Sequence, residues 1–356
     1  MQMLLTEFRE EYRELLLDFL WRQWDALGVA GTVEGDDSWL IDPEALLAFT
    51  CTVGRHDARL FDEVIDWLHK NGAFINTQRL KRVLRKERFA GTKVLAAVAG
   101  LLNRGTDALK WRSLAIVKEK KVEPEPLFYF KDGNSAGQWG EAEPHFQQYG
   151  FLRGRLELRG YSRRFRPNTT TNLIPQLRSL FGVSGRCEVL AYLLTHKDAH
   201  PSEVARETYY CQKTVQDSMV DMNSSGIVNV RTKGKEKRYW IQREQWAALL
   251  NREDRMPQWV TWPPMFAALE RVWLALTAIV AQDTSDKLRL TAHLFPIMQE
   301  IRPMIQRAGF QEALSGERLH VGEEHYDAFL NDIKRLLGYL TPDKAEKLRS
   351  GRLSNC

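Results

Sequence analysis

One short segment in the second half of the chain combines amide, hydroxyl and charged side chains that could hydrogen-bond to nucleic-acid bases. Its polar residues are Gln212, Lys213, Thr214, Gln216 and Asp217. Side chains of these types reach base edges when they project from the N-terminal end of a helix. The segment therefore predicts a surface for direct base recognition.

A cluster of basic residues follows closely in the sequence. It comprises Arg231, Lys233, Lys235, Lys237 and Arg238. The segments 227–230 and 239–241 on either side are apolar and favour strands, so the pattern predicts a β-hairpin with this cluster at its tip, around Gly234. A basic tip gains nothing from packing, but it would pair with phosphates and release their counterions.

These candidate residues need elements to position them, and residues 186–241 predict helix, helix, turn, helix and hairpin in that order. In the third helix, Val215, Met219 and Met222 lie four and three residues apart, which places them on one inward face. Gly226 supplies the left-handed residue that ends this helix. The polar residues then lie on the opposite, outward face.

This segment resembles the winged helix-turn-helix of bacterial transcription regulators of the MarR and ArsR type, over residues 186–241 only. In that pattern an alanine of the second helix, three apolar residues of the recognition helix and a closing glycine stand at fixed intervals. The matching residues are Ala205, Val215, Met219, Met222 and Gly226, with the aromatic pair Tyr239 and Trp240 at the end of the wing. The resemblance implies that the helix from Lys213 enters the major groove. It also implies that the wing residues lie on an adjacent backbone, namely Lys233, Lys235, Lys237 and Arg238.

The chain departs from this pattern in the turn between the two helices. Thr208 stands where an apolar residue is usual, and Tyr209 stands where glycine is frequent. Tyr209 could adopt a left-handed backbone only at an energetic cost.

Four segments are predicted along the chain, and the expected fold class is mainly α. They are a helical N-terminal domain (1–122), an arginine-rich connector with short strands (123–183), the winged helix-turn-helix (184–248) and a helical C-terminal domain for dimerisation or effector binding (262–345). Between residues 151 and 180 the connector holds seven arginines against one acid, Glu157. Such a run is either a solvated face or a phosphate-facing surface. The arginines are Arg153, Arg155, Arg159, Arg163, Arg164, Arg166 and Arg178.

Two further segments allow two interpretations each. Residues 43–88 form either a second, degenerate helix-turn-helix or an ordinary three-helix bundle. The basic residues that would serve the former are Arg79, Lys81, Arg82, Arg85, Lys86 and Arg88. Trp259, Trp262 and Trp273 suit a core or a dimer seam, or alternatively the wall of a ligand pocket.

Catalytic and metal-binding patterns are weak, so we expect no enzyme, no cofactor and no metal. Residues 133–137 spell G-x-S-x-G, but the sequence after them predicts a loop and not the helix that a nucleophile elbow requires. Gly234 and Lys235 are followed by Glu236, which excludes a phosphate-binding loop. His320 and His325 flank two acids that are better explained as helix N-terminal residues. The four cysteines form no C-x-x-C pair.

Composition favours a cytoplasmic protein. The 51 basic and 46 acidic residues give a net charge of +5, so clusters matter more than the total. The first helix is amphipathic and rich in acids, unlike a signal peptide, and the most apolar stretch, 265–281, carries Glu270 and Arg271. We therefore expect no membrane-spanning segment.

The sequence as a whole predicts a sequence-specific DNA-binding transcriptional regulator. Its expected partner is double-stranded DNA, bound by a homodimer with two half-sites about one helical turn apart. The alternative is a protein-interaction module, such as the antitoxin of a bacterial defence pair that binds DNA to regulate its own operon. Such a module would have a protein partner.

Overall fold

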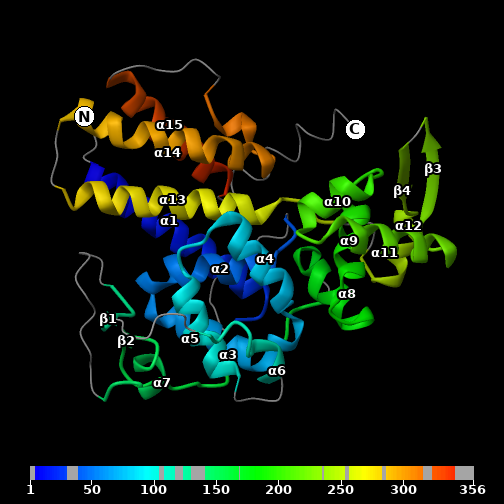
Figure 1. The fold of residues 1–356 in the computed structure, drawn as a ribbon, viewed down its shortest axis with the longest axis horizontal. Helices are drawn as coiled ribbons and strands as arrows, with labels where there is room; N and C mark the ends of the chain where they lie inside the picture. The colour runs from blue at the N-terminus through cyan, green and yellow to red at the C-terminus, as the bar shows by residue number, and fades with distance from the viewer. Residues whose placement is uncertain are drawn as a thin grey trace.

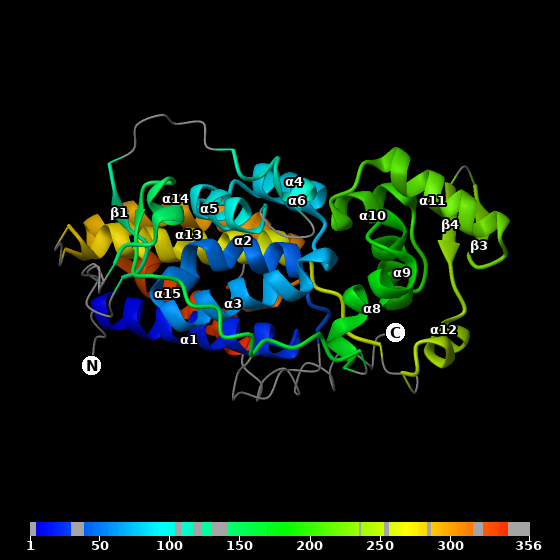
Figure 2. The ribbon, with the colours of Figure 1, turned by 90° about the horizontal axis from the view of Figure 1, so that it is seen from below.

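The computed structural model describes residues 5–29, 39–103, 108–116, 123–129, 141–167, 169–234, 236–252, 256–282, 286–315 and 323–340. Its secondary structure is mainly helical with only small sheets, as the sequence predicts. The helices divide into two units that lie side by side in Figures 1 and 2. Each unit has its own hydrophobic core.

The larger unit, here called the main body, gathers helices from both ends of the chain. They are α1 (Leu5–Ala26), α2 (Pro43–Val53), α3 (Ala58–Asn71), α4 (Thr77–Glu87), α5 (Thr92–Leu102), α13 (Trp262–Val280), α14 (Lys287–Arg307) and α15 (Glu323–Tyr339). Every residue of α2 is buried, because this helix lies between its neighbours at the centre of the core. The Asp42 side chain caps it by accepting from the backbone N–H of Ala45.

The segments predicted as an N-terminal (1–122) and a C-terminal (262–345) domain contribute helices to one shared hydrophobic core. Helix α13 packs against α1, α2 and α14, and the ring of Phe266 stacks on that of Phe49 at 4.9 Å. Trp262 and Trp273 are buried in this core, which favours the core interpretation for Trp262, whereas Trp273 also lines a cavity. By length and composition alone α13 is apolar enough to cross a membrane, but 67% of that stretch is buried inside the protein.

The connector contributes to the main body and forms little regular structure. It contains the short elements β1 (Glu125–Pro126), α7 (Pro144–Gln147), β2 (Phe151–Leu152) and the 3₁₀ turn η3 (Thr170–Asn172), and the short helix α6 (Ala108–Trp111) precedes it. β1 and β2 pair in parallel and are two residues long each, so the strand content of the connector is small in the described residues. Beyond Leu152 the chain runs across α3, where the Asp66 carboxylate accepts hydrogen bonds from the backbone N–H groups of Gly160 and Ser162.

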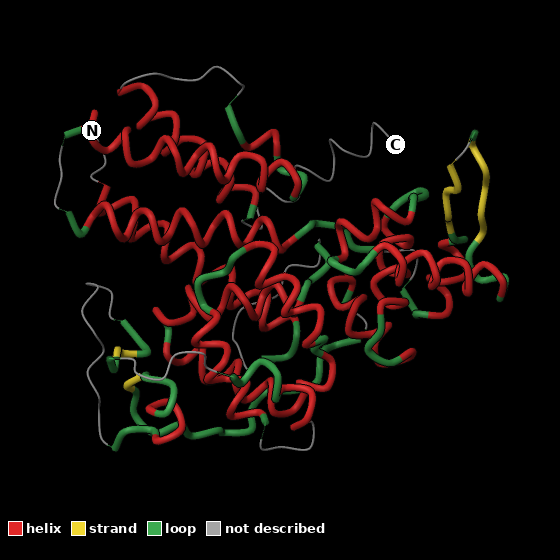
Figure 3. The backbone as a smooth tube through the Cα atoms, in the orientation of Figure 1, coloured by secondary structure: helices red, strands yellow, loops and turns green. Residues whose placement is uncertain are grey.

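The smaller unit, here called the central unit, spans residues 173–250. It consists of α8 (Leu173–Phe181), α9 (Gly185–Thr195), α10 (Pro201–Thr208), α11 (Gln212–Ser224), β3 (Asn229–Lys233), β4 (Glu236–Trp240) and α12 (Arg243–Leu249). Its core includes Leu193, Val204, Met219 and Tyr239. The β3–β4 hairpin extends away from the main body, as Figures 1 and 3 show.

Candidate nucleic-acid interface

Helix α11 separates an apolar face from a polar one, as its sequence predicts. Val215, Met219 and Met222 are buried against the rest of the central unit, where α11 packs on α9 and α10. The predicted base-contacting residues are all exposed: Gln212, Lys213, Thr214, Gln216 and Asp217. The N-terminal half of this helix therefore presents a polar surface to solvent.

A glycine turns the chain from α11 into the hairpin. Gly226 has φ +77°, the left-handed conformation that favours glycine, and a Cβ there would meet nothing within 4 Å. The carbonyl of Met222 accepts from the backbone N–H groups of Ile227 (3.0 Å) and Val228 (3.1 Å). Strand β3 starts immediately afterwards, so helix and hairpin are joined by a short, hydrogen-bonded turn.

Four of the five basic residues belong to the strands, namely Arg231, Lys233, Lys237 and Arg238, which corrects the prediction that 231–238 forms the tip. β3 and β4 pair antiparallel from Asn229 with Trp240 to Lys233 with Glu236, so the turn is confined to residues 234 and 235. Gly234 has φ +64° there. Arg231 and Lys237 are exposed on opposite strands. Lys235 and the side chain of Lys233 lie outside the described part of the structure.

Arg238 binds within the protein, so its position differs from the one expected for a phosphate contact. Its guanidinium donates to Asp198 (2.5 Å) and, through two nitrogens, to Glu203 (3.0 Å each). Arg231 also pairs with Asp198. The hydrogen bond from Arg238 is the main reason that the pKa of Asp198 lies below its ordinary value. Since Glu203 also belongs to the capping box of α10, these contacts attach the base of the hairpin to α10.

Backbone pairing strengthens the same attachment. Ala199 and Tyr239 exchange two hydrogen bonds of 2.9 Å, so a residue just before α10 pairs with β4. The hairpin is therefore fixed in direction relative to α10 and α11. This matters for recognition because a surface composed of helix and hairpin keeps one shape before it meets a ligand.

The turn between α10 and α11 faces the main body, and it lies directly before the N-terminus of α11. Tyr209 has φ +63°, the strained conformation anticipated at this position, and its hydroxyl donates to Glu87 Oε1 at 2.5 Å. The Nζ of Lys86 lies 4.4 Å from the centre of the Tyr209 ring. Asn76 donates to the Tyr210 hydroxyl at 2.5 Å. The turn is thereby docked on α4, while the polar residues that follow it in α11 stay exposed.

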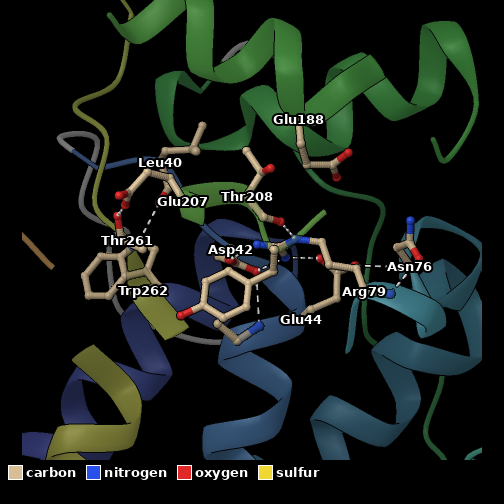
Figure 4. Close-up of polar contacts among 12 residues, drawn as sticks. Leu40, Asp42, Glu44, Asn76, Arg79, Glu188, Glu207, Thr208, Thr261 and Trp262 are labelled. Atoms are coloured by element: carbon tan, nitrogen blue, oxygen red, sulfur yellow. Dashed lines mark hydrogen bonds and ion pairs between the residues drawn. The ribbon is translucent and has the colours of Figure 1, made fainter. Parts of the chain in front are cut away.

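A buried ion-pair network holds the two units together (Figure 4). Arg79 of α4 binds Asp42 (2.5 Å) and Glu44 (2.7 Å), and it donates to the carbonyl of Thr208 in the central unit (2.8 Å). Glu44 also accepts from Arg178 of α8 at 2.6 Å, and Arg178 reaches Glu188 of α9. Burial raises the pKa of Glu44, but Arg178 and Arg79 outweigh it, so the pKa lies below its ordinary value.

Two basic segments were predicted outside residues 184–248: the 79–88 run and the connector arginines. The network contains one residue of each, Arg79 and Arg178. Arg79 is buried in ion pairs, and Arg82 lies over the Tyr210 ring at 4.7 Å, so these two members of the 79–88 run face the central unit. Within the 43–88 segment, α2 is wholly buried, which fits the three-helix bundle.

The connector arginines do not form a single surface. Arg178 is buried in the network, and Arg153 is buried in a bidentate pair with Asp62 (2.6 and 2.8 Å). The remaining five are exposed: Arg155, Arg159, Arg163, Arg164 and Arg166. Because this stretch lies over α3, its arginines belong to the main body and not to the hairpin surface (Figure 2).

The other sequence candidates contribute no site in the described residues. The G-x-S-x-G segment at 133–137 and His320 lie outside them, and His325 is buried. The described residues contain no group of three or more His, Cys, Asp or Glu side chains that could hold a metal ion. Sequence reasoning missed Tyr209, Tyr210 and Arg79 as docking residues. The one sequence feature that pointed to this turn was Tyr209 itself, which stands where glycine is frequent and has a left-handed backbone.

Comparisons of the chain with protein families, with curated proteins and with solved structures found no match. The functional argument therefore rests on the geometry of α11 and the hairpin.

Proposed function

We propose that this protein is a transcriptional regulator that binds double-stranded DNA through a winged helix-turn-helix formed by α9, α10, α11 and the β3–β4 hairpin. The observation that carries the proposal is the exposure of the polar N-terminal face of α11 beside a projecting hairpin. Both elements are fixed to α10: α11 packs on it, and the hairpin is attached through Arg238 and through the backbone pairing of Ala199 with Tyr239. Such a surface can enter a major groove without rearrangement of the main body.

The proposed roles follow from position and charge. Gln216 and Gln212 carry amides that can pair with base edges, since glutamine matches the donor and acceptor pattern of adenine. Lys213 and Lys237 are exposed cations placed for phosphate contacts. Arg238 positions the hairpin through Asp198 and Glu203, and so acts on DNA indirectly.

Selection of bound duplexes from a random pool tests this function. We expect one preferred motif to be enriched, with symmetry if the protein binds as a dimer. The Gln216→Ala variant should lose preference at one or two positions, at a cost of about 1–3 kcal/mol for the preferred duplex, while binding to unrelated duplexes stays nearly unchanged. Fluorescence anisotropy with both duplexes measures this difference.

The matched control is Gln245→Ala, which removes an exposed glutamine of α12. It should leave both affinities unchanged. An unenriched pool, or an equal loss on every duplex for Gln216→Ala, would refute base reading by α11.

A further inference from the structure

A cavity of about 310 Å³ lies in the main body, away from the central unit. It is bounded by the first half of α1, by the end of α2 with the 3₁₀ turn η1 (Gly54–His56), and by the second half of α13. Ligand pockets in proteins usually begin at about this size, so the volume suits a small molecule.

Three guanidinium groups line this cavity, against one carboxylate. Arg9 and Arg13 of α1 both pair with Glu10, while Arg55 comes from η1 on the opposite side. Arg55 is oriented by donating to the carbonyls of Pro126 (2.7 Å) and Leu127 (2.9 Å). Glu10 is the only acid among the described lining residues, and Glu125 pairs with Arg55 from outside the lining at 3.9 Å, so three guanidinium groups face two carboxylates and the walls keep a positive charge.

An aromatic wall faces these charges. The His56 ring meets Trp273 edge-on, with centroids 4.8 Å apart, and lies along the Tyr129 ring at 5.5 Å. Burial, followed by the fields of Arg13, Arg55 and Arg9, lowers the pKa of His56 to about 4, so this imidazole is neutral near pH 7. Its Nδ1 is buried and has no hydrogen-bond partner in the described structure.

We propose that this cavity binds a small organic anion that has one anionic group and a flat apolar body. The guanidinium groups supply charge-assisted hydrogen bonds to the anionic group. The rings of His56, Tyr129 and Trp273 pack against the apolar body. The volume limits the ligand to about the size of an indole or phenyl compound.

Calorimetric titration of the full chain without DNA tests this site independently of the proposed function. The probes are indole-3-acetate, its neutral analogue indole-3-acetamide, and phenyl phosphate. We expect indole-3-acetate or phenyl phosphate to bind at least about 10-fold more tightly than the amide, and the better of the two identifies the anionic group as carboxylate or phosphate. Equal binding of the amide, or no binding of either anion at millimolar concentration, would overturn the proposal.

Two variants locate the binding. Arg9→Gln removes a lining charge and should lower the affinity for the more tightly bound anion about 10-fold. Leu274→Trp places a large ring at an exposed lining position and should block binding. The control Arg289→Gln removes an exposed arginine outside the lining and should change nothing. Circular dichroism confirms that each variant is folded. Unchanged affinity in both folded lining variants would place the binding elsewhere and refute the assignment.

Discussion

Lys237 and Arg238 are neighbours in β4, yet the structure gives them different tasks. Successive side chains of a strand point to opposite faces, so Lys237 is exposed while Arg238 turns toward Asp198 and Glu203. The sequence shows a basic cluster, but it does not show which cations are already paired, because the partner carboxylates lie more than thirty positions earlier. Charge clusters alone therefore overstate the number of phosphate contacts.

His56 predicts a pH dependence of stability. Its pKa falls from an ordinary value of 6.5 in the unfolded chain to about 4 in the folded protein, mainly through burial. The stability that this neutral imidazole contributes is complete above pH 6.5 and is lost as the pH falls toward 4, because the unfolded chain binds the proton more readily. Between pH 7 and pH 5, His56 should lower the free energy of unfolding by about 2 kcal/mol.

Urea denaturation of wild-type and His56→Gln protein at pH 7 and pH 5 measures this effect. The stability of the variant should depend less on pH, by about that amount. If the two proteins lose equal stability on acidification, His56 is not the group responsible.

At the scale of elements, α11 was predictable and its docked turn was not. Val215, Met219, Met222 and Gly226 lie close together in the sequence, so their spacing alone indicates a helix, its buried face and its end. Tyr209 is held by Glu87, which is 122 positions away, and no local pattern reveals that contact. The same limit applies to the connector, whose short strands depend on the core beneath them.

The Tyr209 turn predicts a measurable contribution to folding. Tyr209→Phe keeps the ring but removes its hydrogen bond to the Glu87 carboxylate, so the free energy of unfolding should fall by about 1.5–3 kcal/mol. Tyr161 is 63% exposed, and Tyr161→Phe should change stability by less than about 0.5 kcal/mol. Equilibrium unfolding in urea distinguishes the two variants, and equal effects would contradict the assignment of Tyr209 as an anchor.

For the whole molecule, the mainly α class follows from sequence periodicity, but the division into domains does not. The apolar stripe of α13 predicts a buried helix without indicating that α1 and α2 bury it. Likewise, Arg79 and Arg178 read as members of basic runs, although Asp42, Glu44 and Glu188 neutralise them. Long-range partners decide both outcomes, and the sequence pattern contains only local information.

The network between the units predicts that they are coupled. Arg178→Met leaves Glu44 and Glu188 buried without their guanidinium partner, so the free energy of unfolding should fall by about 3–5 kcal/mol. Amide hydrogen exchange should accelerate in both α2 and α9. The control Arg186→Met breaks an exposed pair with Asp221 and should cost less than about 1 kcal/mol. Faster exchange in α9 alone would show that the units are independent.

The salt dependence of DNA affinity tests the central claim most directly. Replacing Lys233, Lys235 and Lys237 with alanine should weaken binding to all duplexes and reduce the slope of log affinity against log salt by about one for each lost phosphate contact. The control replaces Lys287, Arg289 and Lys334 on α14 and α15, which removes the same charge from the main body. We expect its slope to match that of the wild type. A slope unchanged by the hairpin substitutions, or reduced equally by both sets, would contradict DNA binding through the hairpin.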